Sequence, residues 1–273
     1  MIQSGMVSVR VDVLPLFPAL RSELIALLEG LSPPAWQAPT ACPGWSVHGV
    51  ASHLLGVEVG NVSVRRDGWR LSPGPGEDPD RWLGGFNQQW VDASKRLSPV
   101  ILIDMLALAS QRFIEHVATL DLEAEVGAVT WATGTRSAPV WLDVAREYME
   151  RFVHQYQIRE ATGRPALGRD FIAPVLTAAA HALPRALDSI ERPIGTSVRF
   201  VAEGEGGGAW SVVQTENGWE LTIGPVSSPA CELTTTVGDA LKLYVRDPSG
   251  APPDRRGDPE LAEALSGVKA ILG

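Results

Sequence analysis

The hydrophobic period of the chain changes near residue 195, and this change limits the possible folds more than any other feature of the sequence. Before it, apolar residues recur every three or four positions, as in residues 13–31, which is the spacing of one face of an α-helix. After it, short segments rich in Val, Thr and Trp alternate with turn residues, and Asn217-Gly218 is typical of a tight β-hairpin. The sequence therefore predicts an α+β protein, with a helical domain in residues 1–192 and a small α+β domain in residues 193–273.

The same patterns predict the individual elements. Helices are expected at residues 13–31, 45–67, 80–97, 99–120, 138–165, 170–190, 238–245 and 258–272, and strands at VRFVAE, AWSVVQTE, WELTIG and CELTTTV. Residues 80–120 are treated as one helical stretch that can break at Ser98-Pro99, because proline is well placed to start a fresh helix. Residues 122–139 and the proline-rich segment before Asp258 are expected to be loops.

Composition and charge exclude several classes of function. The 273 residues are 45% hydrophobic and 20% charged, as in soluble globular proteins. The net charge of -9 argues against nucleic acids and anionic membrane surfaces, since both are bound through excess Lys and Arg. The two cysteines lie far apart, no apolar run reaches membrane-spanning length and no clean signal peptide is present, so a cytoplasmic protein without disulfides is expected.

The predicted helix at residues 138–165 carries the sharpest chemical signal, a carboxylate and an imidazole four residues apart. Positions i and i+4 lie on one face of a helix, so Glu150 and His154 can converge on one ion. A solvated ion pair is an equally good interpretation of this helix taken alone, because such pairs are common on helix surfaces.

His53 is a third candidate ligand, on the predicted helix 45–67. It shares a stripe with Val50, Val57 and Val64, which turns its ring toward the apolar side of the helix. Taken alone, His53 is more often a hydrogen-bonded core histidine. Three small residues flank the stripe and leave space beside the histidine for a neighbouring backbone or a ligand; they are Gly49, Gly56 and Gly60.

Together His53, Glu150 and His154 form a two-histidine, one-carboxylate set. Three such ligands leave positions open for water or substrate, as in catalytic sites for zinc and other divalent ions. Cys42 is interpreted as a small buried residue, and His48 lies on a different helical face and is expected to point to solvent.

Two segments carry a resemblance to a known family. TACPGWSVHGVASHLLGVE, followed about a hundred residues later by EYMERFVHQYQIREATGRP, resembles the mycothiol-dependent maleylpyruvate isomerase-like family of DinB-like proteins. The resemblance implies a metal-binding four-helix bundle followed by a small α/β sandwich-like domain similar to sterol-carrier-protein folds. It implies that His53, Glu150 and His154 hold a divalent metal, usually zinc, and that the protein is a cytoplasmic enzyme using mycothiol.

The implied chemistry is attack by an activated low-molecular-weight thiol on a small electrophilic substrate, giving isomerisation or S-transfer. Two further positions bear on this chemistry. Where relatives commonly carry an aspartate three residues after the last ligand histidine, this chain has Gln157, which cannot act as a charged partner or base. Arg246 is the nearest match to an arginine that helps to position thiol or substrate, although a surface arginine is the alternative interpretation.

Three classes of function stay open at this point. The first is a metal- and mycothiol-dependent isomerase or S-transferase. The second is a metal-dependent hydrolase that activates water instead of sulfur. The third is a non-catalytic binding or regulatory protein that keeps the helical bundle, and the exchange of aspartate for Gln157 favours it.

Overall fold

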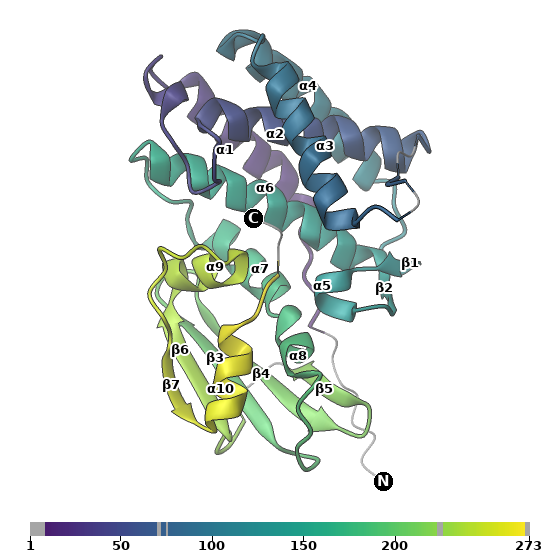
Figure 1. Cartoon of the computed structure of the whole chain (residues 1–273), viewed down its shortest axis with the longest axis vertical. Helices are drawn as coiled ribbons and strands as arrows, with labels where there is room; N and C mark the ends of the chain where they lie inside the picture. The colour runs from purple at the N-terminus through teal and green to yellow at the C-terminus, as the bar shows by residue number, and fades with distance from the viewer. Residues whose placement is uncertain (1–8, 70–71, 75, 223–225, 271–273) are drawn as a thin grey trace. The chain divides into compact units, whose positions relative to one another are not determined.

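A computed structural model describes residues 9–69, 72–74, 76–222 and 226–270, and its chain divides into two compact units (Figure 1). The helical unit comprises Leu14–Leu120 and Arg151–Ala166, and the sheet unit comprises Met1–Val13, Asp121–Glu150 and Leu167–Gly273. The division passes through one continuous helix, α6 (Val140–Ala161). The predicted boundary between domains at residues 192 and 193 stays a prediction.

The helical unit contains the elements that the apolar periodicity predicts. They are α1 (Phe17–Glu29), α2 (Val47–Asn61), α3 (Pro79–Ser94), α4 (Pro99–Val117) and the second half of α6. Short 3₁₀ turns occupy Leu14–Leu16 and Ala35–Gln37, and a π-helical turn, Val62–Arg66, extends α2. The expected stretch 80–120 is two helices, because the Ser98 side chain caps the N-terminus of α4 by accepting a hydrogen bond from the backbone of Ile101.

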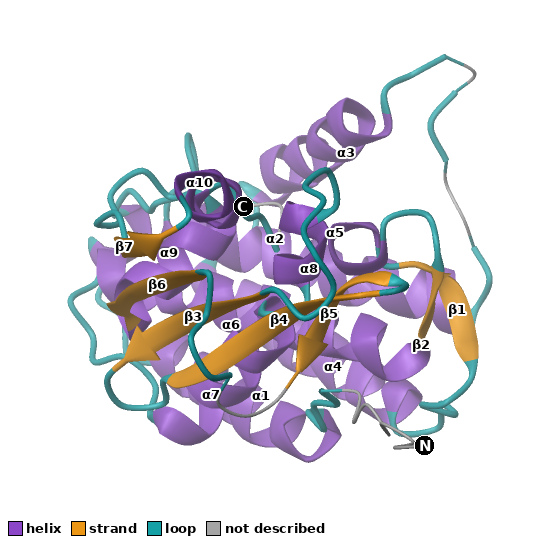
Figure 2. Ribbon diagram, turned by 90° about the horizontal axis from the view of Figure 1, so that it is seen from below, coloured by secondary structure: helices purple, strands orange, loops and turns teal. Residues whose placement is uncertain are grey.

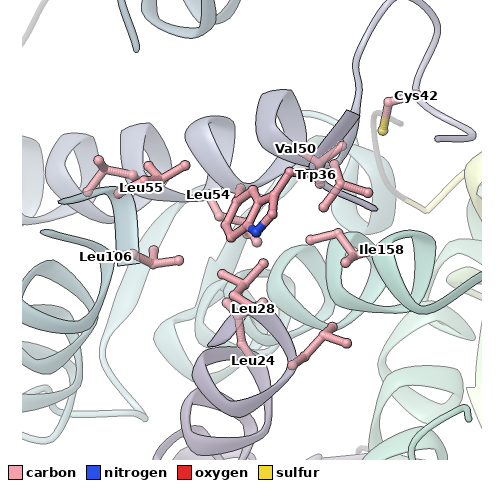
Figure 3. Close-up of a cluster of buried hydrophobic side chains, with 13 residues drawn as sticks. Leu24, Leu28, Trp36, Cys42, Val50, Leu54, Leu55, Leu106 and Ile158 are labelled. Carbon is pink, nitrogen blue, oxygen red and sulfur yellow. The ribbon is translucent and has the colours of Figure 1, made fainter. Parts of the chain in front are cut away.

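Four helices of this unit contribute side chains to one apolar core (Figure 3). Trp36 lies among residues from α1, α2 and α6, including Leu28, Leu54 and Ile158, which are all almost fully buried. Leu102 and Leu106 add the contribution of α4. Burial of this kind stabilises a fold by about 25 cal/mol per Å² of apolar surface, so this core fixes α2 against the second half of α6.

The glycines of α2 differ in what surrounds them. A β-carbon on Gly56 would lie 2.7 Å from the Trp90 ring, and one on Gly49 would lie 3.1 Å from the side chain of Trp45. Aromatic side chains therefore occupy the space beside these two glycines, whereas nothing lies within 4 Å of a β-carbon on Gly60. The expectation of free space beside His53 is wrong for Gly49 and Gly56.

We expect Gly56→Ala to lower the free energy of unfolding by up to about 2 kcal/mol, because overpacking costs about 1–3 kcal/mol and the gain in helix propensity is about 1 kcal/mol. Trp90 cannot move freely, since its indole nitrogen donates a hydrogen bond of 2.9 Å to the Ser52 carbonyl. Gly60→Ala is the matched control and should be neutral or stabilising. Urea unfolding of both variants tests this, and equal effects at the two positions would contradict it.

The sheet unit contains a five-stranded sheet of order β5-β4-β3-β6-β7. Its strands are β3 (Ser197–Glu203), β4 (Gly208–Thr215), β5 (Gly218–Thr222), β6 (Cys231–Thr236) and β7 (Asp254–Gly257). Strands β3 and β6 are parallel and the other neighbours are antiparallel. The Asn217-Gly218 hairpin is confirmed, but β7 lies in the segment expected to be a loop. The predicted strand end at 223–224 and helix end at 271–272 lie outside the described residues.

Helices cover one face of this sheet, as the view in Figure 2 shows. Val198, Phe200 and Ala202 of β3 are buried at alternate positions, whereas Arg199 between them pairs with Glu232. Phe200 contacts Tyr244 of α9, with ring centroids 5.6 Å apart. The covering helices are α7 (Arg169–Ala179), α8 (Ala182–Leu187), α9 (Val237–Val245) and α10 (Pro259–Ser266). The α+β class predicted from the sequence is confirmed.

Two parts of the sheet unit differ from expectation. The segment expected to be a loop at 122–139 forms a small hairpin; its elements are β1 (Glu125–Ala128), α5 (Thr130–Thr133) and β2 (Ser137–Pro139). The expected helix 170–190 is divided into α7 and α8, because Pro184 has no N–H to continue the helical ladder. None of the helices that the structure describes is long and apolar enough to cross a membrane.

Candidate metal centre

Helices α2 and α6 carry the three residues that the sequence singles out. One potential ligand atom from each of His53, Glu150 and His154 lies within 4.8 Å of the other two. Glu150 and His154 are one turn apart on α6, as their spacing predicts. The His53 and His154 rings meet edge to face with centroids 4.8 Å apart, which brings together two residues that are about a hundred positions apart in the sequence.

The two histidines are buried and the carboxylate is partly exposed. His53 is 6% exposed and His154 is 4% exposed, so both rings are largely removed from water. The indole of Trp45 covers His53, with ring centroids 4.9 Å apart, and its nitrogen donates to Gln88 at 2.9 Å. The surface ion-pair interpretation therefore does not describe this site, because two of its three members lie in the interior.

A hydrogen-bonded group lies behind His154. The Oε1 atom of Gln157 is 2.8 Å from Nδ1 of His154 and 3.1 Å from the Cys42 thiol, which donates to it. An amide oxygen can only accept, so this contact is a hydrogen bond in the tautomer that carries the proton on Nδ1 of His154. The other ring nitrogen, Nε2, is then left with the lone pair that a metal ion needs.

A buried ion pair joins α2 to α6 next to the candidate ligands. Arg151 donates from Nε and Nη2 to the two carboxylate oxygens of Glu58, at 2.9 and 2.7 Å. The side chains are only 6% and 5% exposed, and the guanidinium lies 3.9 Å from the centre of the Phe113 ring. A bidentate pair has a fixed geometry, so it sets the register of the two helices that carry the histidines.

An arginine one turn before Glu150 supplies positive charge. Arg146 pairs with Glu147 and, at 3.1 Å, with Asp143. Burial alone would lower the pKa of Arg146, but the carboxylates of Glu147, Asp143 and Glu150 together raise it above its ordinary value. The guanidinium thus stays charged and balances part of the negative charge around Glu150.

The other residues that the sequence singles out are not among the three that converge. Arg246 ends α9 in a left-handed conformation (φ 56°), and its Nη2 donates to the Gly267 carbonyl at 2.7 Å. His48 is half-buried instead of solvent-facing, because its ring bonds to the Leu97 carbonyl at 3.0 Å. Cys42 is buried, as predicted. Neither the Cys42–Gln157 contact nor the Glu58–Arg151 pair was predicted from the sequence, because no local spacing gives a signal for them.

The residues present suit a divalent ion. Two imidazoles and one carboxylate are the donor set of many catalytic zinc sites, with bonds of about 2.0–2.2 Å and a position left open. The hydrogen bond behind His154 is the outer contact that metal-binding histidines usually make. Among the residues that the structure describes, this is the group of three metal-binding side chains that the geometry brings together.

Comparison with known proteins adds family evidence. The family model described as "Mycothiol maleylpyruvate isomerase N-terminal domain" matches residues 17–159, just over half of the chain. The fold is similar to a crystal structure of mycothiol-dependent maleylpyruvate isomerase, with 12% identity and a TM-score of 0.54 over 89% of this chain and 90% of that one. A histidine-to-alanine mutant of that enzyme is similar at 11% identity, with the same TM-score and coverage. No curated protein sequence matches.

Proposed function

The chain belongs to the mycothiol maleylpyruvate isomerase N-terminal domain family, and from this membership we propose that it is a divalent-metal-dependent enzyme acting through mycothiol. The family predicted from the sequence is confirmed, and the chain is a mycothiol-dependent isomerase-like protein. The observation that carries the finer proposal is the convergence of His53, Glu150 and His154. We propose that these three residues bind the metal ion and that the ion is zinc. We also propose that the protein acts in the cytoplasm.

An ion held there would supply positive charge that favours the thiolate form of a bound thiol at neutral pH. Neighbouring side chains orient the three proposed ligands. Trp45 covers the His53 ring and Gln157 holds the proton on Nδ1 of His154. Arg146 balances part of the negative charge around Glu150. These contacts orient the ligand groups; a divalent ion requires neutral imidazoles and an ionised carboxylate.

The proposed reaction is addition of the mycothiol thiolate to an activated alkene, such as that of the maleylpyruvate named for the similar enzyme. The C–S bond forms while the electron pair of the double bond moves onto the conjugated carbonyl. Rotation about the resulting single bond and expulsion of the thiolate restore the alkene as its geometric isomer. Protonation without expulsion gives S-transfer instead. By resemblance, Arg246 is proposed to orient the thiol or a substrate carboxylate.

Metal analysis followed by a turnover assay tests this function. Purified protein is expected to contain zinc and to isomerise maleylpyruvate only when mycothiol is added, with activity lost on chelation and restored by zinc. A panel of other electrophiles scored for thiol adducts detects S-transfer. Hydrolysis of esters or amides without thiol would replace the proposal with a metal-dependent hydrolase. Bound metal without any thiol-dependent product would instead identify a binding protein.

A further inference from the structure

The contact between Cys42, Gln157 and His154 is the feature of the candidate centre that most needs an explanation. The Cys42 thiol lies 3.1 Å from Oε1 of Gln157 and 3.8 Å from Nδ1 of His154. All three residues are buried, with exposures of 6%, 6% and 4%. Water is therefore largely excluded from this group, and the side chains themselves decide which hydrogen bonds form.

The side chain of Gln157 must be held in one of two orientations, whereas a carboxylate at the same position would need no fixed orientation. Both oxygens of a carboxylate accept hydrogen bonds, so a carboxylate turned by 180° still accepts the proton of Nδ1. The carboxamide of Gln157 has an accepting oxygen on one side and a donating NH₂ group on the other. If the NH₂ group faced His154, Nδ1 would have to accept and Nε2 would carry the ring proton. Nε2 could not then bind an ion.

The Cys42 thiol favours one of these two orientations. A thiol donates weakly and accepts weakly, so its better hydrogen bond is to an oxygen. Cys42 and Nδ1 both donate to the same Oε1 atom, and turning the carboxamide would replace the bond from Cys42 with a poorer N–H···S bond. The thiol thus holds the amide oxygen toward His154.

We propose that Cys42 is a positioning residue that acts through Gln157 to keep the proton of His154 on Nδ1 and its Nε2 available for metal. The inference rests on the proposed metal site for its consequence, but the position of the proton can be measured in the metal-free protein.

A double-mutant cycle with zinc(II) as the probe tests the proposal. Zinc affinity, measured by chelator competition, is expected to fall about 10–100-fold in Gln157→Leu, which is the usual cost of losing such an outer contact. Cys42→Ala should weaken binding by several-fold, and Cys42→Ser should restore it because a hydroxyl also donates. In a Gln157→Glu background Cys42→Ala should have no effect, since a carboxylate needs no fixed orientation.

Nitrogen-15 chemical shifts of the His154 ring in metal-free protein provide the second readout. Wild type is expected to show protonated Nδ1, and Cys42→Ala a mixture of both tautomers. Equal tautomer populations in the two proteins would overturn the proposal, as would a loss of zinc affinity on Cys42→Ala that is the same in the wild-type and Gln157→Glu backgrounds. If no protein binds zinc, the proposed function fails, and the tautomer measurement still decides the role of Cys42.

Discussion

Replacing His154 with alanine is expected to remove bound zinc and to lower mycothiol-dependent turnover by more than about 100-fold. Loss of an outer contact to a metal-binding histidine already costs about 10–100-fold, and this change removes the proposed ligand itself. His154 is buried against His53, so its loss leaves only two of the three converging ligand groups. Zinc content by mass spectrometry and steady-state kinetics measure the two effects.

His48→Ala is the matched control for this loss. His48 lies on α2 five residues before His53 but bonds to the Leu97 carbonyl and is not part of the converging group. Its replacement should leave zinc content unchanged. Retention of zinc in His154→Ala, with folding confirmed by circular dichroism, would remove this residue from the proposed ligand set.

Replacing Arg151 with methionine is expected to lower the free energy of unfolding by about 3–5 kcal/mol, because it leaves the buried carboxylate of Glu58 without its partner. The change also removes the contact of the guanidinium with the Phe113 ring. Urea unfolding in the presence of a chelator measures the folding effect without any contribution from bound metal.

Two comparisons make this second prediction specific. The double variant Glu58→Leu with Arg151→Met removes both charges and should be less destabilised than Arg151→Met alone. Glu115→Ala breaks the exposed pair with Arg112, which is 3.2 Å long, and should change stability by less than about 1 kcal/mol. If Arg151→Met cost no more than Glu115→Ala, the buried pair could not be what sets the register of α2 and α6.

The parts of the fold and site that follow a local period were predictable from sequence. The i,i+4 spacing of Glu150 and His154 placed both on one side of α6. The valine stripe of α2 predicted that His53 faces the interior, and it is 6% exposed. The family resemblance then joined the two helices, since periodicity within either segment says nothing about its neighbours in space.

The features that periodicity did not predict depend on contacts between distant residues. Glu58 and Arg151 are separated by 93 positions, and Cys42 and Gln157 by 115. The space beside Gly56 depends on where Trp90 of another helix packs. Strand β7 is short, and it forms because the edge of β6 is available for pairing rather than because its own residues alternate.

The uncharged carboxamide behind His154 has an electronic consequence for any ion held at this site. A carboxylate in that place would push electron density through the imidazole toward the ion and make the histidine a stronger base. The neutral carboxamide of Gln157 donates less electron density than a carboxylate would. An ion at this site would therefore be a stronger Lewis acid than one whose histidine is hydrogen-bonded to a carboxylate. Gln157 cannot act as a charged base, but its neutral carboxamide would let an ion at this site withdraw more electron density from a coordinated sulfur.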